Sequence, residues 1–358
     1  MISRFPSFLS ETAMPRCAVS RRAALGGATA LGLAGLAESR TPRARAAVPP
    51  GDQGIAIVMN SAGASFSVID VASRRVVRTT PVLREPHHWA LLPDHSALLI
   101  GDTSGNAMFF LDPRTGQVLR HTAFSDPYQL WFSPDHRHFV VAALRVNHVD
   151  VYDGSTLQLV KRFRLPTMPS HLSYSPDGGM VFVTLQDNGR LVGIDLHRMA
   201  VAWDQAIGKA PAGVFFHQEK LLVGVMGNAH VAVADAATGR VLRQIPTGRG
   251  AHNLFYAPDG KRIYVTNRVE GTISALDAGT LDVVRTYHVP YGPDCIAFAP
   301  DGHLWISQRW GEHVAVLDPA RDTYQRIAVG RSPHGVFLSA SPTLPGPARP
   351  AVLTLSTP

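Results

Sequence analysis

The stretch PDGKRIYVTN at residues 258–267, continued by GTISALD at residues 271–277 and LDVVRTY at residues 281–287, decides the fold. It reads as a tight turn followed by three short runs rich in Val, Ile, Tyr and Thr, with turn residues between them. β-Branched and aromatic residues favour strands, and Gly, Asn and Asp between such runs favour hairpins. The stretch therefore predicts strands over 262–267, 272–276 and 283–289, preceded by a first strand over 253–257.

An aspartate that ends a short apolar run and opens a turn recurs along the chain at nearly constant spacing. Successive copies lie 40 to 42 residues apart, at Asp70, Asp112, Asp153, Asp195, Asp235, Asp277 and Asp318. A repeat of about 40 residues with several short strands is typical of a β-propeller blade. The predicted fold class is therefore all-β, a seven-bladed β-propeller of four-stranded antiparallel blades.

The two ends of the repeat region are offset by one strand. The first run, at 55–60, matches the second strand of a blade, and the runs at 66–69 and 76–81 match the third and fourth. The last run, at 335–339, matches a first strand. Pairing it with the N-terminal strands would complete the seventh blade and leave no free sheet edge. We therefore expect a ring closed by its C-terminal strand.

The first 46 residues are predicted to be a twin-arginine export signal, which implies a periplasmic location. Arg21 and Arg22 precede an Ala- and Gly-rich stretch that ends near Ala37, and a small-residue cleavage site follows at 44–46. The alternative is a disordered N-terminal arm. The apolar stretch of about 15 residues is shorter than the roughly 20 that span a bilayer, so no membrane span is expected. The other predicted segments are a linker at 47–54, the propeller at 55–340 and a Pro-rich disordered tail at 341–358.

The basic character of the chain lies mainly in this predicted signal. Seven arginines and two glutamates give the first 46 residues a net charge of +5 out of the chain's +7. The near-neutral remainder argues against nucleic acid as a partner, because phosphate binding needs many cations. Cys295 is the one cysteine beyond the signal, so neither an intramolecular disulfide nor a c-type haem is expected. We expect a monomer.

The phrase YVTN at residues 264–267 and its surroundings resemble the YVTN-repeat family of seven-bladed β-propellers. The resemblance covers about residues 55–340 and implies an exported or cell-surface propeller, without specifying a ligand. Relatives in that family include the haem-d1-binding propellers of denitrifying bacteria and a periplasmic member that binds DNA. This sequence departs from the nitrite reductases because it lacks a c-type haem domain.

A propeller of this topology has two faces. The loop face carries the loops between blades and those between second and third strands; the turn face carries the Pro-Asp turns and the aspartate turns. The residue that enters each first strand is expected to face the central channel at the loop face. Counting back from the Pro-Asp turns places these seven positions at His87, Tyr128, Ser170, Ala212, His252, Asp294 and His334.

Four of these positions form a candidate metal site. His252, Asp294, His334 and His87 fall on consecutive blades once the ring is closed. Imidazole and carboxylate groups suit a divalent transition metal such as Zn, Cu or Fe, and a histidine here could also bind a haem-like macrocycle. The alternative is that each imidazole satisfies backbone carbonyls. His88 and His171, one position further along, are expected to point into the blade packing.

The loops between second and third strands add a candidate ligand site on the same face. Arg268 and Arg309 would flank the histidines, with Trp310 as an aromatic neighbour. Guanidinium groups beside an aromatic ring suit an anion, a planar carboxylated ligand or single-stranded nucleic acid. The alternative is that these arginines only keep the surface soluble. The other residues of the predicted ligand site are Asn267, Gln308, Tyr128 and Arg145.

These patterns favour a periplasmic binding protein, not an enzyme, that holds a small molecule, a metal or a haem-like cofactor at the loop-face channel mouth. One alternative is a metal-dependent hydrolase or lyase of the lactonase type. A second is an interaction scaffold that binds a protein partner on the same face. Cys295 as a nucleophile would need a histidine of a neighbouring blade as its base. Whether Tyr128, Trp89 and Trp131 plug the channel is left open.

Overall fold

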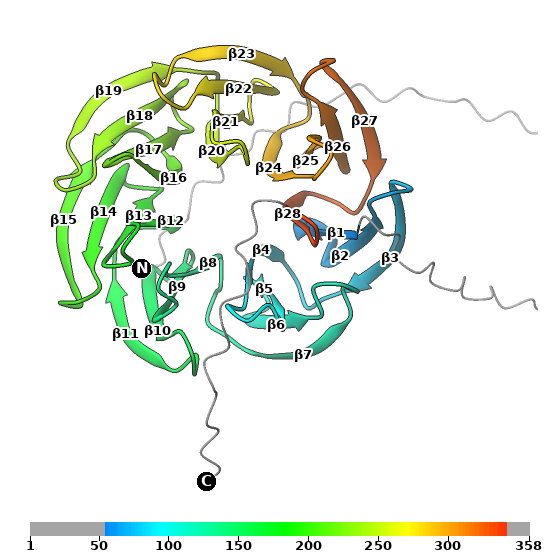
Figure 1. Cartoon of the computed structure of the whole chain (residues 1–358). Helices are drawn as coiled ribbons and strands as arrows, with labels where there is room; N and C mark the ends of the chain where they lie inside the picture. Colours follow the sequence, from blue (N-terminus) through cyan, green and yellow to red (C-terminus); the bar gives the residue numbers. More distant parts are fainter. Residues whose placement is uncertain (1–53, 342–358) are drawn as a thin grey trace, which may run out of the picture. The chain divides into compact units, whose positions relative to one another are not determined.

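The computed structural model describes residues 54–341 as a ring of seven blades around a central axis (Figure 1). In this range 28 strands form seven antiparallel sheets of four, and the one helix is a 3-10 turn at Ser61–Gly63. The predicted seven-bladed propeller is confirmed. No helix in the described range is long and apolar enough to cross a membrane. The predicted export signal and nearly all of the predicted linker and tail lie outside the described residues and stay predictions.

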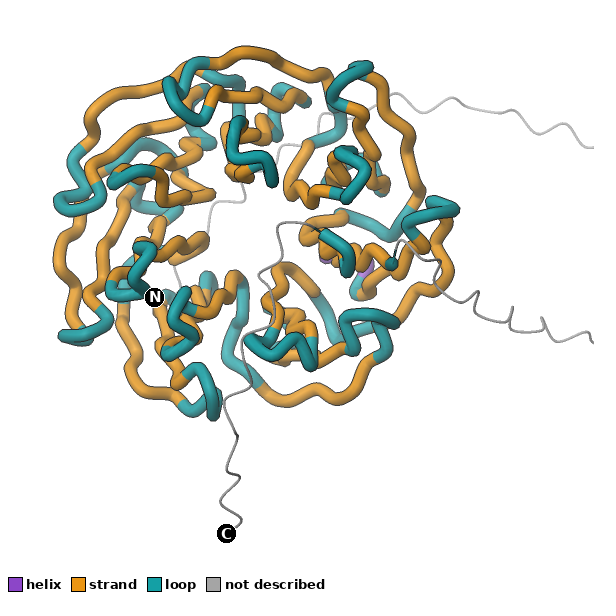
Figure 2. Tube along the Cα trace, viewed as in Figure 1, coloured by secondary structure: helices purple, strands orange, loops and turns teal. Residues whose placement is uncertain are grey.

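Each blade runs from a first strand at the axis to a fourth strand at the rim (Figures 1 and 2). Blade 1 consists of β28 (Pro333–Leu338), β1 (Ile55–Asn60), β2 (Ser65–Asp70) and β3 (Arg75–Pro81). Blade 2 consists of β4 (Pro86–Leu91), β5 (Leu98–Asp102), β6 (Ala107–Leu111) and β7 (Val118–Ala123). Blade 3 consists of β8 (Gln129–Phe132), β9 (His138–Ala143), β10 (His148–Asp153) and β11 (Leu159–Arg164).

The other four blades follow in chain order. Blade 4 consists of β12 (Pro169–Tyr174), β13 (Met180–Leu185), β14 (Arg190–Asp195) and β15 (Ala200–Ala206). Blade 5 consists of β16 (Pro211–His217), β17 (Lys220–Val225), β18 (His230–Asp235) and β19 (Val241–Pro246). Blade 6 consists of β20 (Ala251–Tyr256), β21 (Arg262–Asn267), β22 (Thr272–Asp277) and β23 (Val283–His288). Blade 7 consists of β24 (Pro293–Phe298), β25 (Leu304–Gln308), β26 (His313–Asp318) and β27 (Thr323–Ala328).

The ring closes through blade 1, as predicted. β28 pairs antiparallel with β1, with Phe337 opposite Ile57 and Leu338 opposite Ala56. The Ile55 N–H also donates to Ser339 Oγ at 2.9 Å. The last strand thus covers a sheet edge that the N-terminal strands would otherwise leave unpaired, and it joins the two ends of the ring.

The repeated aspartate has a local structural reason in every blade. Its carboxylate accepts backbone N–H groups two or three residues ahead, as Asp153 does from Ser155 and Thr156 at 3.0 and 2.8 Å. Such side-chain-to-backbone bonds fix the tight turn between third and fourth strands. The fourth strand then crosses the rim, where β7 is exposed along its whole length while β5 and β6 are buried. The 40-residue period is therefore set by turns as well as by burial.

The first strands differ from their predicted bounds. β20 begins at Ala251 and β28 at Pro333, two residues earlier than expected, because both pair with their neighbour from that point through a β-bulge. Between β4 and β5, the three-residue step from Pro86 to Trp89 faces a two-residue step on the partner strand. A bulge inserts one extra residue and re-aims its side chains. The same irregularity occurs in blades 1, 2, 4, 5, 6 and 7.

Candidate functional site

Five histidines from four blades meet at the axis because of these bulges. His87 and His88 both lie at the bulge of β4, and His171 lies at the bulge of β12. The ring centroids of His87 and His334 are 3.7 Å apart, those of His88 and His334 4.5 Å, and those of His171 and His252 5.1 Å. The prediction that His88 and His171 point into the blade packing is therefore wrong. A bulge breaks strict alternation, so two consecutive side chains can face the axis.

Asp294 on β24 holds the loop-face side of this cluster together. Its carboxylate accepts from Arg268 Nη2 at 2.6 Å and lies 3.4 Å from Arg309 Nη1. It also lies 2.9 Å from His252 Nδ1 and 3.4 Å from His334 Nε2. Asp294 and both histidines are at most 1 % exposed. The structure thus brings Arg268 and Arg309, two of the predicted ligand residues, to the Asp294 carboxylate. It brings His252 and His334, two of the predicted metal residues, to the same carboxylate.

Burial sets the charge states of this cluster. It lowers the pKa of His88 to about 3, and burial together with the Arg268 guanidinium lowers the pKa of His252 to about 4. Burial alone would raise the pKa of Asp294, but Arg268 and the neighbouring His334 and His252 outweigh it and hold that pKa well below its ordinary value. At neutral pH the cluster therefore contains a carboxylate, two guanidinium groups and neutral imidazoles.

The histidines differ in whether both of their ring nitrogens have hydrogen-bond partners. His252 can donate from Nδ1 to Asp294 while its Nε2 accepts from Arg268 at 2.8 Å, so both nitrogens are used. His334 Nδ1 faces the carbonyl of His87 at 3.3 Å, and because a carbonyl only accepts, Nδ1 carries the proton. The Nε2 lone pair of neutral His334 then faces a carboxylate oxygen. Each of four rings keeps one buried nitrogen without a hydrogen-bond partner: His87 Nδ1, His88 Nε2, His171 Nε2 and His334 Nε2.

The predicted four-residue metal set does not form one site. The residues divide into two groups with ligand atoms within 4.8 Å of one another, His87 with His88 and His334, and His252 with Asp294 and His334. The second group fits a divalent cation poorly, because the Asp294 carboxylate already faces two guanidinium groups. The first group offers neutral imidazoles, which suit zinc or copper.

All but one of the remaining predicted ligand residues lie apart from the axial cluster. Arg145 pairs with Glu85 and Asp126 between blades 2 and 3. Trp310 is 56 % exposed and packs over Gly292. Asn267 and Gln308 are buried and bind within or beside their own blades, to Ser274 Oγ and to the Pro290 carbonyl respectively. Tyr128 joins the cluster, with its ring centroid 4.2 Å from that of His87.

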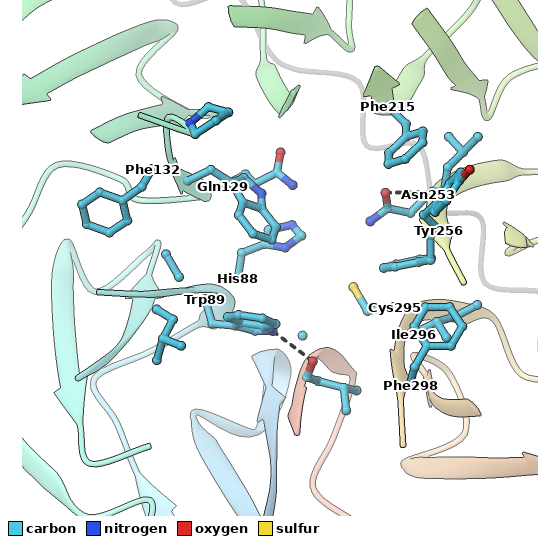
Figure 3. Close-up of a pocket in the computed structure, with 18 of the residues that line it drawn as sticks. His88, Trp89, Gln129, Phe132, Phe215, Asn253, Tyr256, Cys295, Ile296 and Phe298 are labelled. Carbon is cyan, nitrogen blue, oxygen red and sulfur yellow. Dashed lines mark hydrogen bonds between the residues drawn. The ribbon is translucent and has the colours of Figure 1, made fainter. Parts of the chain in front are cut away.

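A cavity of about 800 Å³ opens on the turn face, the opposite end of the channel from the predicted pocket (Figure 3). The inner strands and the Pro-Asp turns form its wall, and His88, Gln129, Asn253 and Cys295 are its polar residues nearest the axial cluster. Its apolar wall includes Trp89, Trp131, Phe132, Phe215, Phe255, Tyr256, Ile296 and Phe298. Arg268, Arg309 and Trp310 do not line it. The channel is therefore closed by the buried cluster on one side and hollow on the other.

Within residues 54–341, no Asp, Glu, Lys or Arg lines this cavity. Its volume lies in the range typical of small-molecule sites, and aromatic walls with a few polar groups are typical of such sites. The described lining residues do not fit a haem, because none of them offers a guanidinium or ammonium group to the propionates, although His88 offers an imidazole. Burial raises the pKa of the Cys295 thiol well above its ordinary value, so this cysteine is a poor nucleophile.

Sequence reasoning missed this cavity, although the sequence carries a sign of it. Aromatic residues stand shortly before most Pro-Asp turns, as in WFSPD at 131–135, FYAPD at 255–259 and FAPD at 298–301. In the repeat these positions fall at the turn-face end of the first strands, next to the axis.

Comparison with known proteins identifies the family. A family model of YNCE-like β-propellers matches residues 22–342. The YncE protein of Salmonella typhimurium is 27% identical over 131 residues, 35% of this chain and 37% of that protein. The YncE protein of Salmonella typhi is 35% identical over 78 residues, 22% of each chain. The matched segments span well under half the length of these relatives.

Solved structures share the fold at low identity. A functionally unknown protein from Desulfotomaculum acetoxidans has a TM-score of 0.67 and 13% identity, covering 80% of this chain and 98% of that one. The dihydro-heme d1 dehydrogenase NirN, in complex with DHE, has a TM-score of 0.62 and 13% identity, covering 81% and 76%. Hydrazine synthase from Kuenenia stuttgartiensis has a TM-score of 0.56 and 23% identity, covering 70% and 88%. These similarities establish the fold alone, whereas the family model covers most of the sequence: the chain belongs to the family of YNCE-like β-propellers.

Proposed function

We propose that this propeller is an exported, periplasmic binding protein that holds a small, mainly apolar and planar molecule in the turn-face cavity. The observation that carries the proposal is the composition of the cavity wall, which combines many aromatic side chains with no formal charge. Flat aromatic walls favour a planar ligand through stacked and edge-to-face contacts. An uncharged wall favours a ligand without several ionised groups, because burying an unpaired charge is costly.

Polar residues at the inner end of the cavity would orient the ligand. The amide side chains of Gln129 and Asn253 both line the cavity, and Gln129 Oε1 accepts from the Leu172 N–H at 2.5 Å. The Asn253 carbonyl oxygen accepts from the Leu254 N–H at 3.0 Å. The Gln129 NH2 group can donate to a ligand acceptor, whereas the Asn253 side chain already bonds the Cys295 thiol. The proposed ligand therefore carries a hydrogen-bond acceptor on one edge.

The structure of NirN in complex with DHE supports a propeller as a holder of planar molecules, although that likeness is one of fold. The predicted twin-arginine signal supports the periplasmic location, because it contains the paired arginines, the apolar stretch and the small-residue site. A rigid ring needs no moving parts for this task, since its first strands fix the wall of the cavity. The proposal thus moves the expected binding site from the loop face to the turn face.

Trp131 provides a direct test with N-phenyl-1-naphthylamine, a neutral aromatic dye, as probe. Trp131 is 41 % exposed and lines the cavity, so Trp131→Ala should weaken dye binding about tenfold while the fold is retained. Trp310→Ala is the matched control, because Trp310 is 56 % exposed but lies on the loop face. Dye fluorescence titrations of the full chain measure both affinities.

Equal affinities of the parent protein and the Trp131→Ala variant would contradict the proposed cavity site. Weakening by Trp310→Ala instead would return the binding site to the loop face and favour the originally expected pocket. If the dye does not bind and the turn face instead captures a protein partner, the scaffold alternative replaces the proposal. Native mass spectrometry of the exported protein would show whether a small molecule is purified with it.

A further inference from the structure

We infer that His87, His88 and His334 form a zinc-class metal site between the turn-face cavity and the buried Asp294 cluster. This site differs from the four-residue set expected from the sequence, because it includes His88 and leaves out His252 and Asp294. It does not depend on an organic ligand in the cavity. The three side chains come from two neighbouring blades, through the bulges of β4 and β28.

The three histidines together offer the nitrogen donors that a zinc site needs. One ligand nitrogen from each of the three rings lies within 4.8 Å of the other two. The ring centroids of His87 and His88 are 5.0 Å apart, and each ring also contacts His334. Zn–N bonds of about 2.0–2.1 Å place ligand nitrogens roughly 3.4 Å apart in a tetrahedral site, so the nitrogens need to approach by at most about 1.4 Å.

Each of the three rings also has a buried nitrogen without a hydrogen-bond partner. His87 and His334 are at most 2 % exposed, His88 is 7 % exposed, and each has one buried nitrogen without a hydrogen-bond partner. Buried polar groups in folded proteins are nearly always satisfied, so three such nitrogens on neighbouring rings require an explanation. A metal ion shared by the three rings supplies it, whereas satisfied His252 needs none.

The tautomer of His334 also suits a metal ligand. Its Nδ1 proton points to the His87 carbonyl, which fixes the ring as a second-shell bond would in a zinc site and leaves Nε2 as the free donor. Nε2 lies 3.4 Å from Asp294 Oδ2, so its lone pair faces a carboxylate oxygen, an arrangement that a metal ion on Nε2 would relieve. Arg309 Nη1 lies 3.4 Å from the same Asp294 oxygen, Oδ2, and Arg268 binds Oδ1, but neither guanidinium group makes a hydrogen bond to His334 Nε2 in the described residues.

Access to the site runs through the cavity. His88 belongs both to the three-histidine group and to the cavity wall, and it is labelled near the centre of Figure 3. Three protein ligands leave a fourth position of a tetrahedral zinc ion open. Water or an anionic group entering from the cavity would complete the coordination.

Isothermal titration of the chelator-treated full chain with Zn²⁺ tests the site, with dye binding measured separately in the zinc-free protein. We expect one Zn²⁺ per chain, and His88→Gln should weaken binding at least about 100-fold, since loss of a second-shell partner alone costs 10- to 100-fold. His252→Gln should keep its affinity within a few-fold. His230→Gln is the matched control, because His230 also has an unpartnered buried nitrogen but lies on β18 of blade 5.

No binding by the parent protein, or equal binding by His88→Gln, would overturn the inference. Loss of binding in His252→Gln would favour the other group, with Asp294, in its place. If the variants do not fold, X-ray absorption spectroscopy of the Co²⁺-loaded parent protein tests the site instead. Scattering from imidazole nitrogens without sulfur would support the site, whereas sulfur scattering from Cys295 would contradict it. Because the dye assay uses zinc-free protein, failure of the organic-ligand proposal and failure of the metal site give different results.

Discussion

The two ends of the central channel are built from the same inner strands but have opposite chemistry. The loop-face end is filled by Asp294, two guanidinium groups and the surrounding imidazoles, and most of these groups are buried. The turn-face end is hollow and walled by aromatic side chains without formal charge. One strand therefore contributes to a polar plug with its first residues and to an apolar cavity with its last ones, as β24 does with Asp294 and Phe298.

This difference indicates that the loop-face end of the channel is rigid and that the turn-face end can accept a ligand. A buried carboxylate with several charged partners is expensive to disturb, because removing one partner leaves the others uncompensated. An apolar cavity has no such constraint, and a ligand gains by filling it. The polar end is thus expected to control stability, and the apolar end to control binding. Three predictions test this division, beyond the tests of the cavity and of the zinc site.

The largest effect is expected from Asp294→Asn. The change keeps the size of the side chain but leaves the Arg268 and Arg309 guanidinium groups without their counter-charge. Breaking a buried ion pair by removing one partner costs about 3–5 kcal/mol of unfolding free energy. Urea unfolding measures this loss. Asp322→Asn is the control, because its pair with Arg285 is about 40 % or more exposed at both ends and should change stability by less than about 1 kcal/mol.

A loss below about 1 kcal/mol in Asp294→Asn would contradict the view of the loop-face end as an electrostatic plug. A larger loss in the Asp322→Asn control would show that the exposed rim pair carries the stability instead. Dye binding at the cavity should survive the Asp294 change wherever the variant remains folded, since Asp294 does not line the cavity.

The second effect is acid destabilisation through the histidines. Burial and the Arg268 charge lower the pKa of His252 to about 4, and burial lowers the pKa of His88 to about 3. Below pH 6.5 these histidines therefore bind protons in the unfolded chain but not in the folded chain. Their contribution to the free energy of unfolding is fully present above pH 6.5 and is lost as the pH falls toward 4. Each such histidine contributes a slope of about 1.4 kcal/mol per pH unit.

His171 allows the pH effect to be measured on one residue. Burial, and then His252 and His88, lower its pKa well below the ordinary value, while Arg268 lowers it further and Asp294 raises it. His171→Gln should therefore reduce the loss of stability between pH 6.5 and 5 by about 2 kcal/mol. Melting temperatures across this range measure the difference. Parallel pH curves for the parent and the variant would mean that the ring is protonated in the folded state.

The smallest effect is expected from Asn267→Ala. The Asn267 amide donates to Ser274 Oγ at 2.9 Å and to Thr272 Oγ1 at 3.1 Å, and the residue is fully buried. Loss of these bonds should cost about 1–2 kcal/mol of unfolding free energy and leave dye binding unchanged. A variant of normal stability with weakened dye binding would instead support the original assignment of Asn267 to a ligand site.

The predicted strands came close to those of the structure because local patterns define them. The run at 262–267 coincides with β21, and the run at 55–60 coincides with β1. The largest errors lie at the first strands, where bulges shift the start by two residues, whereas other predicted strands differ by one residue at an end. A bulge leaves no periodic signature in one sequence, since the extra residue depends on the partner strand.

The candidate site was predicted in part. Sequence spacing identified the axial positions of His87, His252, Asp294 and His334, and the structure brings these residues close together. It could not show that Arg268 and Arg309 would bind Asp294 instead of facing a ligand. It also could not place the cavity, because hollowness depends on how the inner strands of different blades stand against one another.

What the sequence determined by itself is therefore the repeat: seven aspartate turns, four strands per blade and closure by the last strand. These features depend on short-range hydrogen bonds and on patterns of burial, which single residues and their spacing encode. Only the tertiary structure decided which end of the channel is filled, which is hollow, and that His88 and His171 join the axis. Those outcomes depend on side chains about 40 or more residues apart meeting at one point, where packing and charge pairing, and not local preference, select the arrangement.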